Sequence, residues 1–281
     1  MSVVDFSKLY PDNRQEGETV LRQAQLVMLR MLKIIDYICR KHDISYWMCS
    51  GTLLGAVRHK GFIPWDDDLD IIMTHANYEK FIKVCNEQLD REKYYFQEGR
   101  KDWPLNYSKV RLRHTRIEEL EDGGITPENQ GIFVDVFKLD HVPDRNFRGK
   151  WQYFCAKVWL AYMLSCRTYT SASSKKKWIM RGSKLLRIKC VEHFFQRQAE
   201  LYNNRETEYY GFFYGRTNWK NAIISCRVYG KPTYVDFESI KLPVQECVHE
   251  YLTQTFGDYM KLPPEKERIG LHALNVDFGD Y

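Results

Sequence analysis

The sequence predicts an α+β fold, in which short strands form a sheet and helices flank it. Two segments, Glu18–His42 and Ala76–Leu89, carry apolar residues at the spacing of amphipathic helices. Two apolar runs, Asp68–Met73 and Ile132–Leu139, have the length and composition of buried strands. With 281 residues, of which 44% are hydrophobic, the chain can bury the core of one large domain or of two small ones.

Charge and cysteine content restrict the function. The net charge of +5 is a mild basic excess, which suits an anionic ligand or a membrane surface and is too weak to indicate binding of nucleic acid. The eight cysteines are scattered without a C-x-x-C pair, which favours reduced thiols over a disulfide framework or a zinc site. The polar, acidic start differs from a signal peptide, and no run reaches the ~20 apolar residues of a membrane-spanning helix. We therefore expect a soluble, cytoplasmic protein.

The first elements lead to a turn of small residues. The first helix ends in basic residues, which suit a helix C-terminus, and a short strand is expected over Ile44–Met48. Ser50, Gly51 and Thr52 follow immediately. Because their side chains are small, their backbone N–H groups can approach a phosphate closely, and a helical turn is expected directly after them.

An acidic cluster follows this turn, with four aspartates in five positions: Asp66, Asp67, Asp68 and Asp70. In the expected strand, the period of two places Asp68 and Asp70 on one face, where both carboxylates can bind one divalent ion. Carboxylates inside an apolar strand are costly unless they bind a cation or accept hydrogen bonds. Asp66 and Asp67 lie at the edge of the loop, where a solvated or supporting role fits the pattern at least as well.

Two further strands are expected over 94–97 and 107–113, and the second is basic. In it, Lys109, Arg111 and Arg113 alternate with apolar residues. Three cations on one strand face fit either the binding of a diphosphate or an ordinary solvated face.

A later strand carries a third candidate carboxylate. After a polar loop over 117–131, Asp135 lies inside the strand expected over 132–139, and Asp140 follows at its end. If Asp135 points to the sheet face that carries the acidic cluster, it completes a site of three carboxylates.

Residues 147–202 are helical, rich in aromatic residues and then strongly basic. Within them, 174–189 is a basic amphipathic segment that suits an anionic membrane surface, although an exposed helix covering the core explains it slightly better. Farther on, 244–256 is expected to form a helix.

Together these features suit metal-assisted phosphoryl transfer. This chemistry needs a divalent ion and cations near a diphosphate, and little covalent participation from the protein. Carboxylate ligands without a histidine or cysteine cluster favour Mg²⁺ or Mn²⁺ over zinc. Spacing alone is a weak indication, because capping and turn aspartates also give an Asp-x-Asp pattern. The small turn and Asp135 strengthen it.

The stretch from Cys49 to Ile72 closely resembles the signature of the LicD family, which includes bacterial phosphocholine transferases and is related to the eukaryotic fukutin proteins. The resemblance is carried by Ser-Gly-Thr-Leu-Leu-Gly, by Arg58 and by the run from Gly61 to Asp70. Three later blocks are similar to other family motifs: Lys109-Val110-Arg111 with Thr115, Val134 to Asp140, and Phe256 to Met260 with Pro263, Pro264 and His272. The resemblance touches most of the chain except about 145–205.

The resemblance implies a nucleotidyltransferase-like fold, which is a mixed β-sheet flanked by helices, with a helical accessory region. It implies a catalytic core over 1–145, a helical and basic accessory region over 146–205, and a C-terminal segment over 206–281 that completes the catalytic domain. It further implies transfer of a phospho-substituent from a CDP-activated donor to a sugar hydroxyl, with release of CMP.

Site roles follow from the matching positions. The resemblance implies that Asp68 and Asp70 are metal ligands, and that Asp135 is a third ligand or a base for the acceptor hydroxyl. Six residues are assigned to contacts with donor phosphate, diphosphate or acceptor: Ser50, Gly51, Thr52, Arg58, Lys109 and Arg111. Six more are candidates for a supporting or substrate-contacting role: His59, Trp65, Asp66, Asp67, Asp140 and His272.

Three of these candidates also have plain structural explanations. An exposed loop histidine explains His59 about as well as a phosphate contact does. A structural role explains His272 better than a contact in the cleft. Trp65 either stacks on a cytosine base or anchors its loop.

The predicted function is a Mg²⁺-dependent transferase that moves phosphocholine from a CDP-linked donor to a bacterial surface-glycan precursor, such as that of lipopolysaccharide, capsule or teichoic acid. The acceptor is a glycan or a lipid-linked glycan, and segment 174–189 docks the protein on the inner face of the cytoplasmic membrane. The same site also suits CDP-ribitol, CDP-glycerol, CDP-ethanolamine or a CMP-linked phosphonate. Two further alternatives are nucleotidyl transfer from an NTP, which releases pyrophosphate, and a non-catalytic module that binds glycan or nucleotide.

Overall fold

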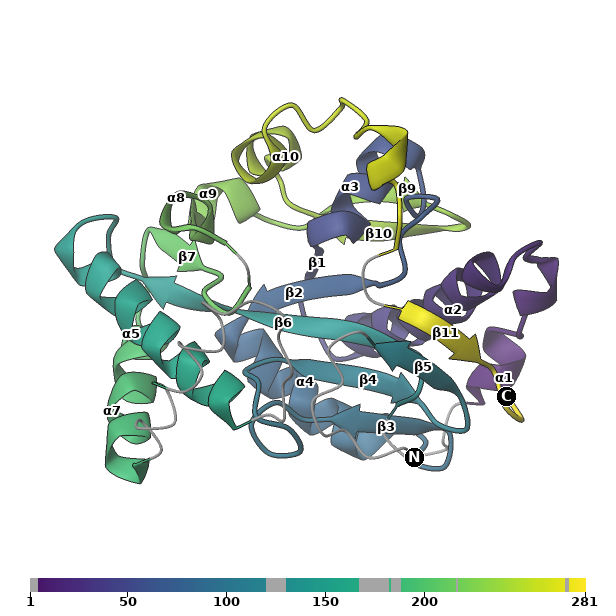
Figure 1. The fold of residues 1–281 in the computed structure, drawn as a ribbon, viewed down its shortest axis with the longest axis horizontal. Coiled ribbons are helices and arrows are strands. Elements are labelled where there is room, and N and C mark those ends of the chain that lie inside the picture. The colour runs from purple at the N-terminus through teal and green to yellow at the C-terminus, as the bar shows by residue number, and fades with distance from the viewer. Residues whose placement is uncertain (1–4, 120–129, 167–181, 183–187, 216, 271–272) are drawn as a thin grey trace.

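The computed structural model describes residues 5–119, 130–166, 182, 188–215, 217–270 and 273–281. Within these residues, the centre is a seven-stranded sheet with the order β1-β2-β6-β4-β3, and β7 and β8 continue it from β6 (Figure 1). β2 and β6 are parallel and the other pairs are antiparallel, which confirms the predicted α+β fold with a mixed sheet. The five strands of the central path are β1 (Trp47–Met48), β2 (Asp70–Thr74), β6 (Phe133–Val142), β4 (Ser108–Leu112) and β3 (Tyr94–Gln97).

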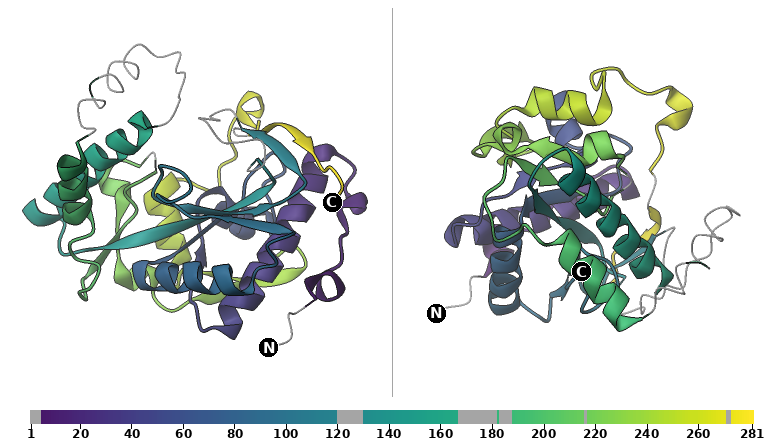
Figure 2. Two further views of the ribbon diagram at one scale, coloured as in Figure 1. Left: turned by 90° about the horizontal axis from the view of Figure 1, so that it is seen from below. Right: turned by 90° about the vertical axis from the view of Figure 1, so that its left-hand side faces the viewer.

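Two helices, α2 (Val20–Lys41) and α4 (His75–Gln88), cover one face of this sheet (Figure 2). The side chains of Thr19 and Thr74 cap them, each accepting a hydrogen bond from a backbone N–H of the first turn. Their apolar sides form the main hydrophobic core together with side chains of β2, β4 and β6. Within the described residues, no helix is long and apolar enough to cross a membrane.

A second group of elements lies beyond the β1 edge of the sheet, at the top of Figure 1. In this group, the antiparallel hairpin of β9 (Thr233–Phe237) and β10 (Ile240–Val244) contacts both α3 (Ser50–His59) and β1. The Phe62 and Phe237 rings pack edge to face at 5.1 Å and join the group to the core. Its elements are α3 (Ser50–His59), α9 (Cys226–Tyr229), β9 (Thr233–Phe237), β10 (Ile240–Val244) and α10 (Val248–Phe256).

The accessory helices have a hydrophobic cluster of their own. α5 (Phe147–Ser165) and α7 (Lys189–Ala199) pack on each other, and their cluster includes Trp159, Phe213 and Val142 at the end of β6. The elements that follow α7 are β7 (Tyr209–Gly211), α8 (Trp219–Ala222) and β8 (Ile223–Ser225). Most of the basic segment 174–189 lies outside the described residues.

The C-terminal end returns to the middle of the chain. β11 (Ala273–Asp277) pairs antiparallel with β5 (Arg116–Glu119), so the loop expected over 117–131 begins as a strand instead. Three short helical segments complete the described part of the fold: α1 (Phe6–Leu9), η1 (Arg14–Glu16) and η4 (Glu265–Glu267). The predicted site residue His272 lies outside the described residues.

β6 is longer than predicted. It extends to Val142, so Asp140 lies inside the strand and not at its end. The extension exists because β7 pairs with residues 140–142, a contact with a distant part of the chain that the local pattern does not reveal.

Candidate active site

Three charged residues form a row across the sheet. Asp70 of β2, Asp135 of β6 and Lys109 of β4 are directly opposite one another in the strand registers, so they share one sheet face. The alternate residues Val134 and Val136 of β6 belong to the core that α2 and α4 cover. The row therefore lies on the face away from these helices. Lys109 Nζ is 3.0 Å from Asp135 Oδ1, and both side chains are buried.

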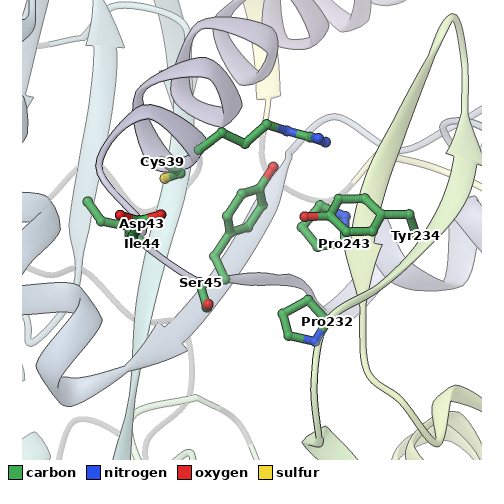
Figure 3. A pocket seen from close by; sticks show the side chains of 9 residues that line it. Cys39, Asp43, Ile44, Ser45, Pro232, Tyr234 and Pro243 are labelled. Carbon is green, nitrogen blue, oxygen red and sulfur yellow. The ribbon is translucent and has the colours of Figure 1, made fainter.

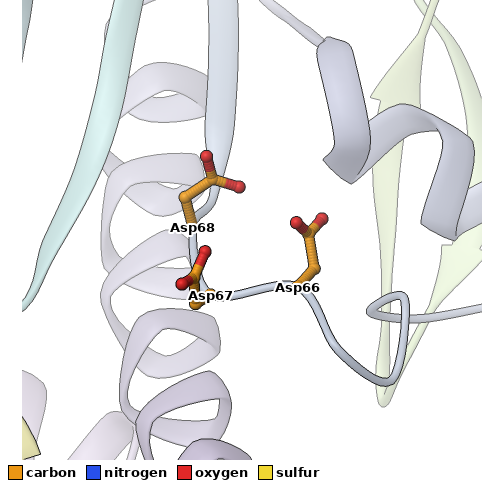
Figure 4. Close-up of side chains that lie close together, drawn as sticks. All are labelled: Asp66, Asp67 and Asp68. Carbon is orange, nitrogen blue, oxygen red and sulfur yellow. The ribbon is translucent and has the colours of Figure 1, made fainter. Parts of the chain in front are cut away.

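The loop before β2 brings three carboxylates together. Asp66, Asp67 and Asp68 each place a carboxylate oxygen within 4.8 Å of the others (Figure 4). Gly51 makes room for this acidic loop, because a Cβ there would lie 2.6 Å from Asp66 Oδ2. Gly270 of the C-terminal segment does the same for Asp67, where a Cβ would lie 2.7 Å from Oδ2. The start of α3 and the C-terminal segment thus both approach the acidic loop closely.

Burial and mutual repulsion favour protonated carboxyls in this cluster. Burial raises the pKa of Asp70 well above its usual value, and the charges of Asp68 and Asp135 raise it further. Burial, with the charges of Asp68 and Asp67, raises the pKa of Asp66 to about 8. Within the described residues, Asp70 Oδ1 is buried without a hydrogen-bond partner. Such a set of hard oxygen donors fits a divalent cation, which would take the place of the protons.

We expect the stability of the protein to depend on pH and on added metal. A carboxyl whose pKa is raised on folding stabilises the protein fully below its unfolded pKa of about 4, and this contribution is lost as pH rises through the folded value. For Asp66 that window extends up to about pH 8. The metal-free protein should therefore have a lower Tm near pH 8 than near pH 6, and MgCl₂ should raise the Tm more near pH 8. NaCl at equal ionic strength is the control, and an equal response to both salts would contradict a cation site.

Helix α3 begins within the turn of small residues rather than after it. Ser50 has a φ of +50°, in the left-handed region that residues with a side chain seldom occupy. A hydrogen bond with Ser50 lowers the pKa of Asp70, against the effect of burial. Thr52 Oγ1 accepts a 2.8 Å hydrogen bond from the backbone N–H of Asp70. These contacts fix the start of α3 against the start of β2, with the positive end of the helix dipole at the acidic loop.

A cationic group lies beside the acidic loop. Arg58 donates from Nη1 to the Tyr259 carbonyl at 3.1 Å and from Nε to His59 Nε2 at 3.0 Å. The Trp65 ring centre lies 5.6 Å from the guanidinium carbon of Arg268 and 6.2 Å from the ring centre of His59. Burial and the charge of Arg268 lower the pKa of Arg58. Arg268 is not predicted from the sequence, because only the path of the C-terminal segment brings it here.

Two predicted site residues are bonded inside the fold. Arg111 is buried and donates from Nε to Gln97 Oε1 at 2.8 Å and from Nη1 to the Gly131 carbonyl at 3.0 Å. Asp140 lies on the opposite face of β6 from the charged row, because side chains alternate along the strand. It is fully buried, accepts a 2.7 Å hydrogen bond from Asn203, and burial raises its pKa to about 6. The structure therefore does not bring Asp140 to the acidic loop.

A pocket of about 290 Å³ lies elsewhere, between the end of α2 and the β9–β10 hairpin (Figure 3). Nine residues line it: Cys39, Arg40, Asp43, Ile44, Ser45, Tyr46, Pro232, Tyr234 and Pro243. None of the nine belongs to the acidic loop or to the charged row. A single carboxylate among its lining residues does not make a metal site, and we assign the pocket no part in the chemistry.

The mixed sheet, its flanking helices and the carboxylates on neighbouring parallel strands define a nucleotidyltransferase-like protein. Residues 43–161 match the family described as LicD/FKTN/FKRP, nucleotidyltransferase domain. The chain is 31% identical over 272 residues to the lipopolysaccharide cholinephosphotransferase LicD of Haemophilus influenzae. These aligned residues cover 90% of this chain and 96% of that protein. The chain belongs to the LicD family.

Two shorter similarities involve uncharacterised rickettsial proteins. A protein of Rickettsia typhi is 46% identical over 65 residues, which is 23% of this chain and 21% of that protein. A protein of Rickettsia prowazekii is 52% identical over 66 residues, which is 24% of this chain and 25% of that protein.

Proposed function

We propose that the protein is a metal-dependent transferase, which moves phosphocholine from a CDP-linked donor to a hydroxyl of a surface-glycan precursor and releases CMP. The observation that carries the proposal is the convergence of the acidic loop with Asp70 and Asp135 at the start of β2. The relative from Haemophilus influenzae is named a lipopolysaccharide cholinephosphotransferase, which supports both the transferred group and an acceptor of the lipopolysaccharide type.

Mg²⁺ or Mn²⁺ suits the donor set of this cluster. Asp68 and Asp70 would hold the ion, and Asp135 is either a third ligand or the base that takes the proton of the acceptor hydroxyl. A bound ion supplies neutralisation of the charge on the donor diphosphate. Asp66 and Asp67 lie close enough to Asp68 to share in binding.

The chain's own cations and N–H groups would position the donor. The backbone at Ser50 to Thr52 begins α3, where N–H groups bind phosphate well, and Arg58 and Arg268 add charge-assisted donors. We expect Arg268→Gln to raise the KM for the donor about tenfold, because one charge-assisted hydrogen bond is lost. The change in kcat should be smaller. Steady-state kinetics of CMP release measure both constants. An unchanged KM would remove Arg268 from the donor site.

A donor screen tests the proposed function. The protein is incubated with MgCl₂ and in turn with CDP-choline, CDP-ethanolamine, CDP-glycerol, CDP-ribitol or a CMP-linked phosphonate, and CMP is measured. Release from CDP-choline that EDTA abolishes would support the proposal. Release from another donor alone would replace phosphocholine by that group, and pyrophosphate released from an NTP would indicate nucleotidyl transfer. Binding without any product would favour a non-catalytic module.

Contact with an anionic membrane is a further part of the proposal. Helix α5 exposes Phe147, Trp151 and Phe154, which lie on one side of the helix by their spacing, and the basic segment 174–189 follows α5 in the sequence. Exposed aromatic residues next to basic ones are typical of surfaces that bind anionic lipid. The protein should sediment with anionic liposomes and not with neutral ones, and Lys→Glu changes in 174–189 should weaken sedimentation. Sedimentation that ignores these changes would contradict the contact.

A further inference from the structure

Three half-buried aromatic rings lie next to the charged row on the same side of the sheet. Phe137 follows Asp135 by two positions on β6, so both side chains are on the face away from α2 and α4. The Phe137 ring centre is 4.8 Å from that of Tyr107 and 5.1 Å from that of Phe212. Tyr107 immediately precedes β4 and Phe212 immediately follows β7, and both strands pair with β6 (Figure 1). We call Tyr107, Phe137 and Phe212 the aromatic trio.

The surroundings of the aromatic trio already attract a cation. Lys109 Nζ lies 3.3 Å from the Phe133 ring centre, 5.5 Å from that of Trp103 and 5.9 Å from that of Tyr107. The faces of aromatic rings are negative, and an ammonium group within about 6 Å is attracted to them. Rings on this side of the sheet thus accept an ammonium group, and because Asp135 balances the charge of Lys109 at 3.0 Å, the pair adds no net repulsion toward a cation at the aromatic trio.

The same surroundings disfavour an uncharged polyol. The side chains of the aromatic trio contain one hydroxyl, that of Tyr107, and otherwise present carbon. A glycerol or ribitol group placed there would lose hydrogen bonds to water without replacing most of them. A trimethylammonium group has no hydrogen-bond donors to satisfy, and its methyl groups pack directly on ring carbon.

We propose that the aromatic trio binds the quaternary ammonium head group of a choline-bearing donor, while the donor phosphate lies at the carboxylates. This inference rests on the proposed transferase function and assigns the part of the site that selects the donor. The spacing agrees with it. Side chains two positions apart on a strand are about 6.6 Å apart, and in phosphocholine a short ethylene linker joins the phosphate to the ammonium group.

The test is a binding measurement, because it does not depend on turnover. The Kd values of CDP-choline and CDP-glycerol are measured by calorimetry with MgCl₂ for the wild type, Phe137→Leu and Phe137→Tyr. Leucine keeps the apolar volume and removes the ring, whereas tyrosine keeps the ring. We expect Phe137→Leu to raise the Kd of CDP-choline about three- to thirtyfold, with the Kd of CDP-glycerol unchanged. Phe137→Tyr should bind like the wild type, as should the control Phe194→Leu, an exposed phenylalanine of α7.

A second probe isolates the head group. Tetramethylammonium chloride should compete with CDP-choline for the wild type and not for Phe137→Leu. If Phe137→Leu does not fold, as judged by thermal unfolding, Phe212→Leu takes its place. An equal rise in the Kd of both donors, or no competition by tetramethylammonium, would overturn the head-group assignment. If the wild type still releases CMP from CDP-choline, the transferase function stands in that case. A wild type that binds none of the CDP-linked donors would overturn the transferase function, and the assignment with it.

Discussion

Replacing Asp70 with asparagine should lower the release of CMP from CDP-choline by roughly a thousandfold or more. Asparagine keeps the shape of the side chain but removes the charge that would hold the ion, and several kcal/mol of lost charge stabilisation corresponds to that factor. Folding should not suffer. Asp70 is buried beside the like charges of Asp68 and Asp135, which raise its pKa, so its removal should raise the Tm of the metal-free protein near pH 8.

Asp140→Asn is the matched control for this experiment. It also neutralises a buried carboxyl whose pKa is raised, but on the opposite face of β6, where Asn203 is its partner. Release of CMP per folded molecule should stay near the wild-type value. If Asp70→Asn gained stability and kept full transfer, the acidic cluster would not be catalytic.

Lys109→Met should lower the free energy of unfolding by about 3–5 kcal/mol. The substitution leaves the carboxylate of Asp135 buried without the cation that lies 3.0 Å away. Asp135 is only 8% exposed, so water cannot readily solvate the charge that remains. Methionine has a similar length and fills most of the space, which keeps the cavity contribution small. Urea denaturation without metal measures the change.

The double variant Lys109→Met, Asp135→Asn separates the charge effect from packing. With both charges removed, most of the lost stability should return, because replacing a whole buried ion pair by neutral groups of similar size is often nearly neutral. If Lys109→Met alone unfolds at the wild-type urea concentration, the ion pair does not contribute to stability, and the buried-pair description of Lys109 is wrong.

Local pattern predicts much of this fold. The helix expected over 18–42 is α2, and the strand expected over 94–97 is β3 with the same bounds. The strand expected over 68–73 is β2, but it begins at Asp70, so Asp68 lies in the loop before it and not on the strand. These elements are readable because their apolar residues repeat at the period of one helix or one strand. The sequence also predicts that Asp135 points to the sheet face that carries the acidic cluster, and Asp135 does lie opposite Asp70 on the neighbouring strand.

What the pattern misses depends on contacts between distant parts of the chain. Within the described residues, the strand partner of β5 is β11, so the sequence from Ile117 onward resembles a loop until this partner is known. The local pattern ends the strand before Asp140, because the pairing of β6 with β7 lies beyond any local window. Arg268 has no periodic neighbour that would place it over Trp65. In each case the deciding interaction is a tertiary contact, which local propensity does not encode.

The approach of the C-terminal segment to the acidic loop has a consequence for biosynthesis. A ribosome adds Asp66, Asp67 and Asp68 long before Gly270, which packs on Asp67. Through most of translation the nascent chain therefore carries a like-charged loop that lacks its final neighbours. We expect the ability to retain metal, and with it activity, to appear only after the segment around Gly270 leaves the ribosome, so that nascent chains without this segment stay inactive.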